Sequence, residues 1–312
     1  MQVLRSIEDL STVRGPIVLA AGVFDGLHVG HQAVLGAAMA SAREISGSAV
    51  ALTFDPHPSR ILNPSRSPRL LTSTPHKLRL MEAFGFDNVL LVKFDHDFAA
   101  TEAVDFVRRL VEASRPLAGI CVGEGWKFGH DRRGDGTLLR QMGAESAFVT
   151  TEVSPVKVGG HTVSSTRIRS AVASGELSTV REFLGREYSV FGTVSKGEGL
   201  GHQIGFPTAN LATDNEQFPP DGVYAVRVGI RGELRDGVAN IGTRPTVVNS
   251  GLRLLEVNIF DFSGDLYGTD IEVVFCKLLR GERKFSGIEA LRSQIFIDVE
   301  EARIALASVS RP

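Results

Sequence analysis

The stretch PIVLAAGVFDGLHVGHQAVLGAAMASARE, residues 16–44, passes from an apolar run into a helical pattern. Its first part predicts a buried strand, because strands covered on both faces are apolar along their whole length. Its last part carries apolar side chains at helical spacing and predicts a helix. Two histidines and a glycine, His28, Gly30 and His31, stand where the strand gives way to the helix.

The rest of the first half continues this alternation of strands and helices. Strands are predicted for SAVALTF at 48–54, NVLLVKF at 88–94 and AGICVG at 118–123. One helix is predicted between Thr74 and Gly85, and another at 102–115 with Thr101 as its N-cap. Short apolar strands separated by amphipathic helices indicate an α/β domain, a parallel sheet with helices on both faces.

The second half consists of strand-like segments separated by turns that contain glycine or aspartate. The predicted strands are EYSVFGTVSKG at 187–197, DGVYAVRVGI at 221–230, GELRDGVANIG at 232–242, LRLLEVNIFDF at 252–262 and TDIEVVFCKLL at 269–279. Several alternate apolar with polar residues, which indicates an antiparallel sheet or a small barrel.

Two capping boxes near the end of the chain predict two C-terminal helices. The boxes are Ser286 with Glu289, before a helix at about 287–296, and Asp298 with Glu301, before a helix at about 299–308. The pattern changes from strands alternating with helices to strands separated by turns. This change predicts a domain boundary near Arg186, with domains at 1–186 and 187–312.

The composition favours an ordinary protein of a reducing compartment. Its 312 residues carry 34 basic and 36 acidic side chains, a formal net charge of −2, which gives no electrostatic case for nucleic-acid binding. Cys121 and Cys276 lie far apart in apolar runs, which favours two buried thiols over a disulfide or a metal site. The N-terminal residues are too charged for a signal peptide, and no apolar run approaches the ~20 residues of a membrane span. We expect a soluble cytoplasmic protein; its oligomeric state stays open, a homo-oligomer included.

The turn GVFDGLHVGH, residues 22–31, has the features of a phosphate site. Ligands of an open parallel sheet bind at the carboxyl ends of its strands, where a helix N-terminus offers free N–H groups and a positive dipole end. Gly30 lets a phosphate approach the backbone, and His28 and His31 can donate hydrogen bonds as charge develops at phosphorus. The alternatives are ordinary loop histidines or a zinc pair, for which no persuasive third ligand is near.

A second segment, VSSTRIRSAVASGEL at 163–177, places hydroxyl side chains at the start of a predicted helix. Ser165 and Thr166 stand at this start, and Arg167 and Arg169 follow in the first turn. Cations are unfavourable near a helix N-terminus unless an anion is bound there, so the pattern favours a phosphate ligand. The alternative is an ordinary Ser/Thr cap followed by solvent-facing arginines.

The segment GTVSKGEGLGHQIGFPTANL, residues 192–211, joins a glycine-rich stretch to hard oxygen ligands. It is neither a P-loop, because no GK[ST] follows, nor a dinucleotide loop, because no GxGxxG opens a helix. Thr208 offers a hydroxyl and Asn210 an amide oxygen, which Mg²⁺ carrying phosphates accepts alongside water. Glu256 stands on a predicted strand and is a candidate general base; the alternative is a glutamate that faces water.

The first-half motifs resemble the adenylyltransferase module of the bacterial bifunctional riboflavin kinase/FAD synthetase family. The resemblance is carried by HxGH at 28–31, SSTxxR at 164–169, TFDPHPSRIL at 53–62 and residues 70–95. It implies a Rossmann-like nucleotidyltransferase domain that transfers AMP from ATP to FMN, with His28 and His31 stabilising the transition state at the α-phosphate. By the same resemblance, the ATP-binding residues are Gly22, Phe24, Gly30, Ser165, Thr166 and Arg169, and the flavin-binding residues are Phe54, Pro56 and Pro58.

The second half is similar to the riboflavin kinase domain of the same family, through DGVYAV, GVANIGTRPT, FDFSGDLYG and KFSGIEALRSQIFIDVEEAR. The resemblance implies a six-stranded antiparallel barrel that phosphorylates riboflavin to FMN. Gly197, Gly201, Thr208 and Asn210 would bind Mg-ATP, with Mg²⁺ at Thr208 and Asn210. Glu256 would take the proton from the ribityl hydroxyl. The implied ligands are therefore riboflavin, FMN, ATP and Mg²⁺.

The sequence departs from the family pattern in two places. In the second half, Leu200 and His202 stand where the family usually has arginine on either side of Gly201, which is expected to affect nucleotide affinity. The other departure lies in the first half. In VGEGWKFG, residues 122–129, Gly125 stands where the family usually has Asn or Asp. A side chain that could hydrogen-bond substrate is absent at this position. The alternative to a bifunctional enzyme is therefore a monofunctional riboflavin kinase whose N-terminal domain has weak or no FAD synthetase activity.

Overall fold

The structure, a computed structural model, describes residues 1–196, 201, 205–214, 217–243 and 253–308. The chain divides into two compact units, each assembled from two stretches of sequence. The first unit comprises Met1–Arg69 and Lys77–Ser165, and the second comprises Leu70–His76 and Thr166–Pro312. The domain boundary near Arg186 stays a prediction.

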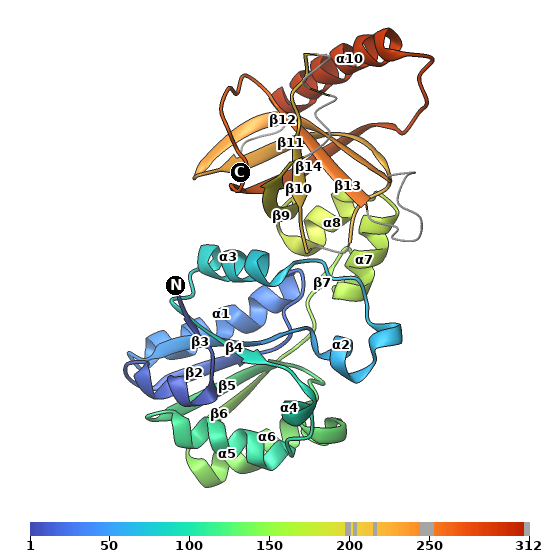
Figure 1. Ribbon diagram of the computed structural model, residues 1–312. Helices are drawn as coiled ribbons and strands as arrows, with labels where there is room; N and C mark the ends of the chain where they lie inside the picture. The colour runs from blue at the N-terminus through green and yellow to red at the C-terminus, as the bar shows by residue number, and fades with distance from the viewer. Residues whose placement is uncertain (197–200, 202–204, 215–216, 244–252, 309–312) are drawn as a thin grey trace. The chain divides into compact units, whose positions relative to one another are not determined.

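The first unit is built on a parallel sheet, as predicted, and this sheet has six strands (Figure 1). The strands are β1 (Gln2–Leu4), β2 (Ile17–Ala21), β3 (Ser48–Asp55), β4 (Asn88–Lys93), β5 (Leu117–Gly123) and β6 (Val149–Val153). Their order is β1-β4-β3-β2-β5-β6, and each neighbouring pair runs parallel. The sequence pattern does not predict the edge strands β1 and β6, because neither lies in a long apolar run.

Helices cover both faces of this sheet (Figure 1). The helical elements are η1 (Ile7–Thr12), α1 (Val29–Glu44), α2 (Pro58–Leu62), η2 (Pro64–Arg66), α3 (Thr74–Phe84), α4 (His96–Ala99), α5 (Ala103–Ala113), η3 (His130–Arg132) and α6 (Gly136–Ser146). A short hairpin pairs β7 (Lys157–Val158) with β8 (His161–Thr162).

Side chains of β2 alternate between the two faces of the sheet. Val18 and Ala20 belong to the core cluster that contains residues of α1 and Met81 of α3. Ile17 and Leu19 belong to the cluster that contains residues of η1, α5 and α6. Both faces are therefore buried, which explains why this strand reads as a continuous apolar run.

Two helix ends predicted from the sequence have different outcomes. Helix α3 begins at Thr74 and ends before Gly85, as predicted. Thr101 is not the N-cap of α5, because the cap is Glu102 and no side chain bonds there. The carbonyl of Thr101 instead accepts a hydrogen bond from the backbone N–H of His130 at 2.8 Å. This contact with a residue distant in sequence holds Thr101 outside the helix.

The second unit contains a closed six-stranded antiparallel barrel, as predicted (Figure 1). The strands are β9 (Tyr188–Ser195), β10 (Ala209–Ala212), β11 (Gly222–Ile230), β12 (Glu233–Thr243), β13 (Arg253–Ile259) and β14 (Asp270–Gly281). Their order around the barrel is β10-β13-β12-β11-β14-β9. Helices α7 (Ser165–Ala173) and α8 (Leu177–Leu184) precede the barrel in the sequence. Closure pairs every strand on both sides, the short β10 included.

A single helix, α10 (Ile288–Ala307), stands where two C-terminal helices were expected. Gly287 is its N-cap and gives no side-chain bond, so the box predicted at Ser286 does not start it. Asp298 lies within the helix, buried, and accepts hydrogen bonds from Nε and Nη2 of Arg280 at 2.8 and 2.7 Å. Because this carboxylate is satisfied by an arginine of β14 rather than by backbone N–H groups, the helix continues through it. No helix among the described residues is long and apolar enough to cross a membrane.

The segment Leu70–His76 is bonded to the barrel although it is remote in sequence. The hydroxyl of Tyr188 on β9 lies 3.3 Å from the carbonyl oxygen of Leu71 and 2.7 Å from that of Gln217. The backbone N–H of Gln217 donates to the carbonyl of Leu70 at 3.0 Å. The second unit therefore includes a strap of chain from the first half of the sequence.

His76 ends this strap in a buried cluster of charged and polar groups. Its Nε2 lies 3.3 Å from Oε1 of Glu272 on β14 and 3.3 Å from the hydroxyl of Ser189 on β9. Burial raises the pKa of Glu272, but the hydrogen bond and charge of His76, a hydrogen bond with Ser189 and the Arg186 guanidinium outweigh it. The pKa of Glu272 is lowered to about 2. The ionised carboxylate is thus favoured by the folded state.

We predict that Glu272→Gln destabilises the second unit in a pH-dependent way. Because the folded pKa of Glu272 is about 2 and its ordinary pKa is 4.5, the ionised group stabilises the fold above pH 4.5, and this contribution is lost as the pH falls toward 2. The variant should lose about 1–3 kcal/mol of unfolding free energy at neutral pH, and the deficit should narrow below pH 4.5. Urea unfolding followed by tyrosine fluorescence measures this, because all 3 tyrosines lie in the second unit and the 1 tryptophan does not.

The matched control for this prediction is Glu233→Gln. Glu233 forms an exposed ion pair with Arg235, which should contribute little to stability, so the unfolding midpoint should stay close to that of the wild type. An unchanged stability of Glu272→Gln at neutral pH, or a deficit that stays constant down to pH 2, would contradict the stabilising role of the carboxylate.

Candidate active sites

The turn after β2 places two imidazole rings in contact at the start of α1. His28 is the N-cap of α1, and its Nδ1 accepts the backbone N–H of His31 at 3.2 Å. The two rings stack with centroids 3.5 Å apart and planes 17° from parallel. His28 is 6% exposed, and Phe24, which is 1% exposed, packs edge-on against His31. Helix-cap geometry therefore brings the predicted histidine pair together.

Gly30 lies between the two histidines, where a side chain fits poorly. A Cβ at this position would lie 3.2 Å from Nδ1 and Cε1 of His28, closer than an ordinary contact. Gly22 extends the pairing of β2, because its N–H donates to the carbonyl of Leu52 at 3.0 Å. Helix α1 has 16 residues, so its first N–H groups and its dipole suit a phosphate at the carboxyl ends of the strands.

Ser165, the first residue of α7, contacts the same turn. Its hydroxyl donates to the carbonyl oxygen of Asp25 at 3.0 Å, and Asp25 is itself buried. The start of the SSTxxR motif is therefore brought to the turn that carries the histidines. Thr166 and Arg169 belong to the second unit, and their contacts with ATP stay predictions.

The three residues expected to line a flavin pocket lie at the end of β3 and in the turn that follows it. Phe54 is 7% exposed and packs against Phe94 and Phe98, with ring centroids 5.6 and 6.0 Å away. Pro56 and Pro58 are half-buried, and Pro58 is the first residue of α2. The structure thus places the three residues together along one turn, while their contact with flavin stays a prediction.

The loop after β5 contains Gly125, the position that departs from the family pattern. Gly125 has a φ of +76°, and no atom lies within 4 Å of a Cβ built there. Trp126 stacks on Phe128 with ring centroids 4.7 Å apart. Its backbone N–H donates to the carbonyl of Gly123 at 3.0 Å. The position therefore has room for a side chain, and asparagine is among the residues that accept a positive φ most readily.

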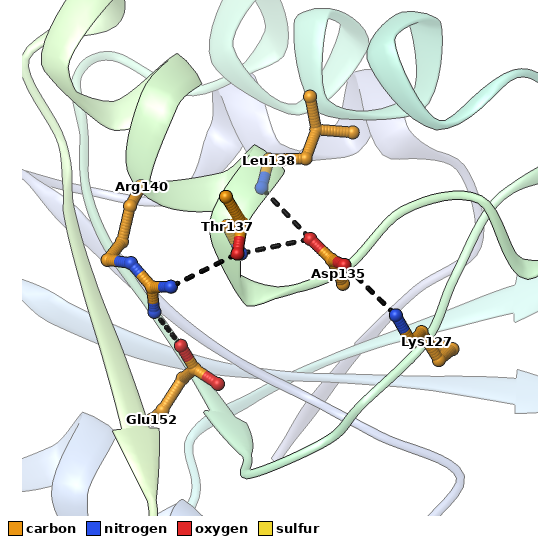
Figure 2. A network of polar contacts seen from close by, with 6 residues as sticks. All are labelled: Lys127, Asp135, Thr137, Leu138, Arg140 and Glu152. Atoms are coloured by element: carbon orange, nitrogen blue, oxygen red, sulfur yellow. Dashed lines mark hydrogen bonds and ion pairs between the residues drawn. The ribbon is translucent and has the colours of Figure 1, made fainter.

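Polar contacts tie this loop to α6 (Figure 2). Lys127 donates to Oδ2 of Asp135 at 2.9 Å, and Oδ1 of Asp135 accepts two backbone N–H groups at the start of α6. The hydrogen bond from Lys127 lowers the pKa of Asp135 below its ordinary value. Arg140 of α6 in turn pairs with Glu152 of β6. The backbone around Gly125 is thus supported by contacts that do not involve position 125.

The second unit contains a cavity of about 440 Å³ lined by residues of β10–β14 and α10. Four of the residues expected to bind ATP or act in phosphorylation line it: Gly201, Thr208, Asn210 and Glu256. Gly197, also expected to bind ATP, lies outside the described residues. The structure therefore gathers one predicted set of residues around one cavity.

The register of the barrel strands places Glu256 in a row of polar side chains. Glu256 on β13 is directly opposite Asn210 on β10 and Asn240 on β12. Directly opposed residues of antiparallel strands share a face, and all three line the cavity. Asn240 was not identified from the sequence. Its sequence signal is a single amide side chain between apolar neighbours in GVANIG.

Two further cavity residues were also missed. Asn258 donates from Nδ2 to the carbonyl of Pro207 at 2.7 Å, which ties β13 to the PTAN segment. It stands two residues after Glu256 and so shares its face, which is a signal that the sequence does contain. Arg280 lines the cavity and is held by Asp298, a pairing between distant residues that leaves no local signal.

The oxygen atoms in this cavity are of the type that Mg²⁺ binds. The hydroxyl of Thr208, the amide oxygen of Asn210 and the carboxylate of Glu256 are hard donors, and Mg²⁺ usually combines a few such groups with phosphates and water. In the part of the chain that the structure describes, no group of 3 or more His, Cys, Asp and Glu side chains is arranged to hold a metal. The donor set therefore fits an ion that arrives with nucleotide phosphates.

Two protein-family models match the chain, one in each half, in the same order as the motifs found in the sequence. The family model for FAD synthetase matches residues 11–167, and that for riboflavin kinase matches residues 184–306. The bifunctional riboflavin kinase/FMN adenylyltransferase of Escherichia coli is 38% identical over 97% of both chains. The protein of that name from Pseudomonas fluorescens is 36% identical over 99% of both chains, and that from Bacillus subtilis is 35% identical over 91% of both.

A solved structure shares the fold over nearly the whole chain. It is the crystal structure of a Streptococcus pneumoniae protein described as a macrolide-efflux protein, with 28% sequence identity and a TM-score of 0.80. The match covers 97% of this chain and 98% of that one.

Proposed function

Because the chain belongs to the bifunctional riboflavin kinase/FMN adenylyltransferase family, we propose which residues carry out each of its two reactions. The chain phosphorylates riboflavin to FMN and adenylylates FMN to FAD, with ATP as a substrate of both steps. Both family models match, so a kinase without FAD synthetase activity is not favoured. We assign riboflavin phosphorylation to a kinase domain at 187–312 and adenylylation to a domain at 1–186.

The kinase assignment is carried by one observation, the position of Glu256 opposite Asn210 in the barrel cavity. In this proposal Glu256 accepts the proton of the ribityl hydroxyl while the hydroxyl oxygen attacks the γ-phosphorus of ATP, and the bond from that phosphorus to the β,γ-bridging oxygen breaks, so that ADP leaves. Thr208 and Asn210 would hold Mg²⁺, which when bound neutralises phosphate charge. Phosphoryl transfer is mostly positioning and charge stabilisation, so this small set of residues suffices.

The adenylylation assignment rests on the histidine pair at the start of α1. Nδ1 of His28 accepts the N–H of His31, so the proton of a neutral His28 ring is on Nε2, which can donate. Both histidines would donate to oxygens of the α-phosphate as the FMN phosphate attacks it and pyrophosphate leaves. Ser165, Thr166 and Arg169 would hold the remaining phosphates of ATP.

The proposed location of the protein is the cytoplasm. Cys121 and Cys276 are free thiols, which persist in reducing compartments. Burial raises the pKa of Cys121, so this thiol is also poorly reactive. Both reactions consume ATP, and a supply of ATP in the cytoplasm would support them.

The product profile tests the two assignments together. On incubation with riboflavin and Mg-ATP, we expect FMN to appear first and FAD to follow, separated by chromatography. Accumulation of FMN without FAD, even when FMN is supplied, would contradict the proposed role of the first unit.

Glu256→Gln should lower riboflavin phosphorylation roughly 10²–10⁴-fold, because an amide cannot act as the general base. Adenylylation of supplied FMN should continue, since it is assigned to other residues. The initial rates of FMN and FAD formation measure both effects. The exposed Glu233 on β12 gives the matched control, Glu233→Gln, which should keep both rates. Near-normal riboflavin phosphorylation by a folded Glu256→Gln variant would contradict the assignment of Glu256 as the general base.

His28→Ala and His31→Ala should each lower FAD formation about 10²–10³-fold, the usual effect of losing a preorganised donor at a developing oxyanion. FMN formation from riboflavin should be spared. His130→Ala, at a histidine whose side chain is 43% exposed in the same unit, is the matched control and should leave FAD formation unchanged. Equal loss of both activities would indicate a folding defect rather than lost catalysis.

Gly125→Asn should speed FAD formation from FMN by about tenfold, because it restores a side chain that can hydrogen-bond substrate. FMN formation from riboflavin should not change. Gly159→Asn is the matched control, since Gly159 also has a positive φ (+57°) and open space around it. If Gly125→Asn is neutral or harmful while Gly159→Asn is neutral, the glycine is a tolerated loop variation.

A further inference from the structure

One lysine of the first unit is buried with every donor of its ammonium group engaged. Lys77 on α3 is 6% exposed. Its Nζ lies 3.0 Å from Oγ1 of Thr53, 3.2 Å from the carbonyl oxygen of Phe54 and 3.3 Å from that of Val23. An ammonium group has three N–H donors, so these three acceptors use all of them.

The acceptors come from two separate segments of the chain, each of which leads into a turn. Val23 follows β2 and precedes the turn that carries His28. Thr53 and Phe54 lie near the end of β3 and precede the turn that carries Pro56. The hydroxyl of Thr53 also donates to the carbonyl of Val23 at 2.9 Å, which closes the network. Lys77 therefore adds three hydrogen bonds to the direct contact between the segments that lead into the two turns.

Keeping the ammonium group of Lys77 charged in a buried position costs free energy. Burial lowers the pKa of Lys77 to about 8, while the carboxylates of Asp25 and Asp55 oppose the shift. The group is therefore mostly protonated at neutral pH and keeps its three donors. A methionine would fill similar space without a buried charge, so packing alone does not account for a lysine at this position.

We propose that Lys77 is a positioning residue that sets the separation between the ATP turn and the flavin turn during adenylylation. The proposal rests on the proposed function, in which the turn of His28 receives the α-phosphate and the turn after β3 receives FMN. Lys77 does not contact substrate, because its donors are all committed to the protein. Its effect is to bring the FMN phosphate within reach of the α-phosphorus, about 3–3.5 Å, where a misplacement of about 1 Å can cost 10²-fold in rate.

The primary test is Lys77→Met in the full chain, which keeps an unbranched side chain and removes the ammonium group. We expect kcat for adenylylation of FMN to fall about 10–100-fold, with KM for ATP and FMN nearly unchanged. Riboflavin phosphorylation by the same preparation should match the wild type. Lys93→Met is the matched control, because Lys93 ends β4 in the same unit with an 81% exposed side chain, and it should keep all constants.

A second variant keeps the proposal testable if Lys77→Met does not fold. Thr53→Val is nearly isosteric and removes the hydroxyl shared by Lys77 and Val23; it should lower the same kcat by a smaller factor. In the double variant the two effects should be less than additive, because both remove one network. Trp126, the 1 tryptophan of the chain, lies in the first unit and reports whether that unit is folded.

Turnover and substrate affinity respond differently to a positioning role and to a purely structural one. A folded Lys77→Met variant with wild-type kcat for adenylylation would overturn the proposal, whether or not its KM is raised. If Lys77→Met does not fold, a wild-type kcat in Thr53→Val would overturn it instead. A lowered kcat in Lys77→Met beside an unaffected His28→Ala would instead refute the histidine assignment and leave the positioning role standing.

Discussion

The first backbone N–H groups of a helix have no partners within that helix, and in α1 they emerge at the edge of a sheet that is buried on both faces. His28 satisfies one of them with its own ring, and stacks on His31 as a result. The remaining N–H groups favour an anion. The close approach at Gly30 and the contact from Ser165 to this turn are consistent with the same requirement. In the proposed adenylylation site, the preference for a phosphate thus arises from a backbone constraint, to which the two histidines add their donors.

The second unit depends on strand register instead. Side chains alternate across a strand, so a slip of one residue would move Glu256 to the opposite face of the barrel wall. Closure of the barrel fixes the pairing of β13 on both sides, with Asn210 in one neighbour and Asn240 in the other. The polar row is therefore held by backbone hydrogen bonds of three strands, and Asn258 adds a side-chain tie to the PTAN segment.

Local patterns were enough to predict the central strands of the first unit, the helices between them, and an antiparallel sheet or small barrel in the second unit, whereas the six-stranded barrel was implied by the family resemblance. They failed where a residue's partner is distant in sequence. Asp298 has the local pattern of a helix cap, but its partner is Arg280 on β14, so one helix forms where two were predicted. Thr101 failed for the same reason through its contact with His130. At the sites, sequence motifs supplied the histidines and the PTAN segment, whereas Asn240 became visible only through strand register and Lys77 only through burial.

The strap Leu70–His76 has a consequence for how the chain folds as it is synthesised. Synthesis runs from the N-terminus, so these residues leave the ribosome well before β9, and β14, which ends at Gly281, follows later still. Until then His76 lacks Glu272, and the carbonyl of Leu71 lacks the hydroxyl of Tyr188. The second unit can therefore be completed only after β14 has been synthesised, and no single cut in the chain releases it whole.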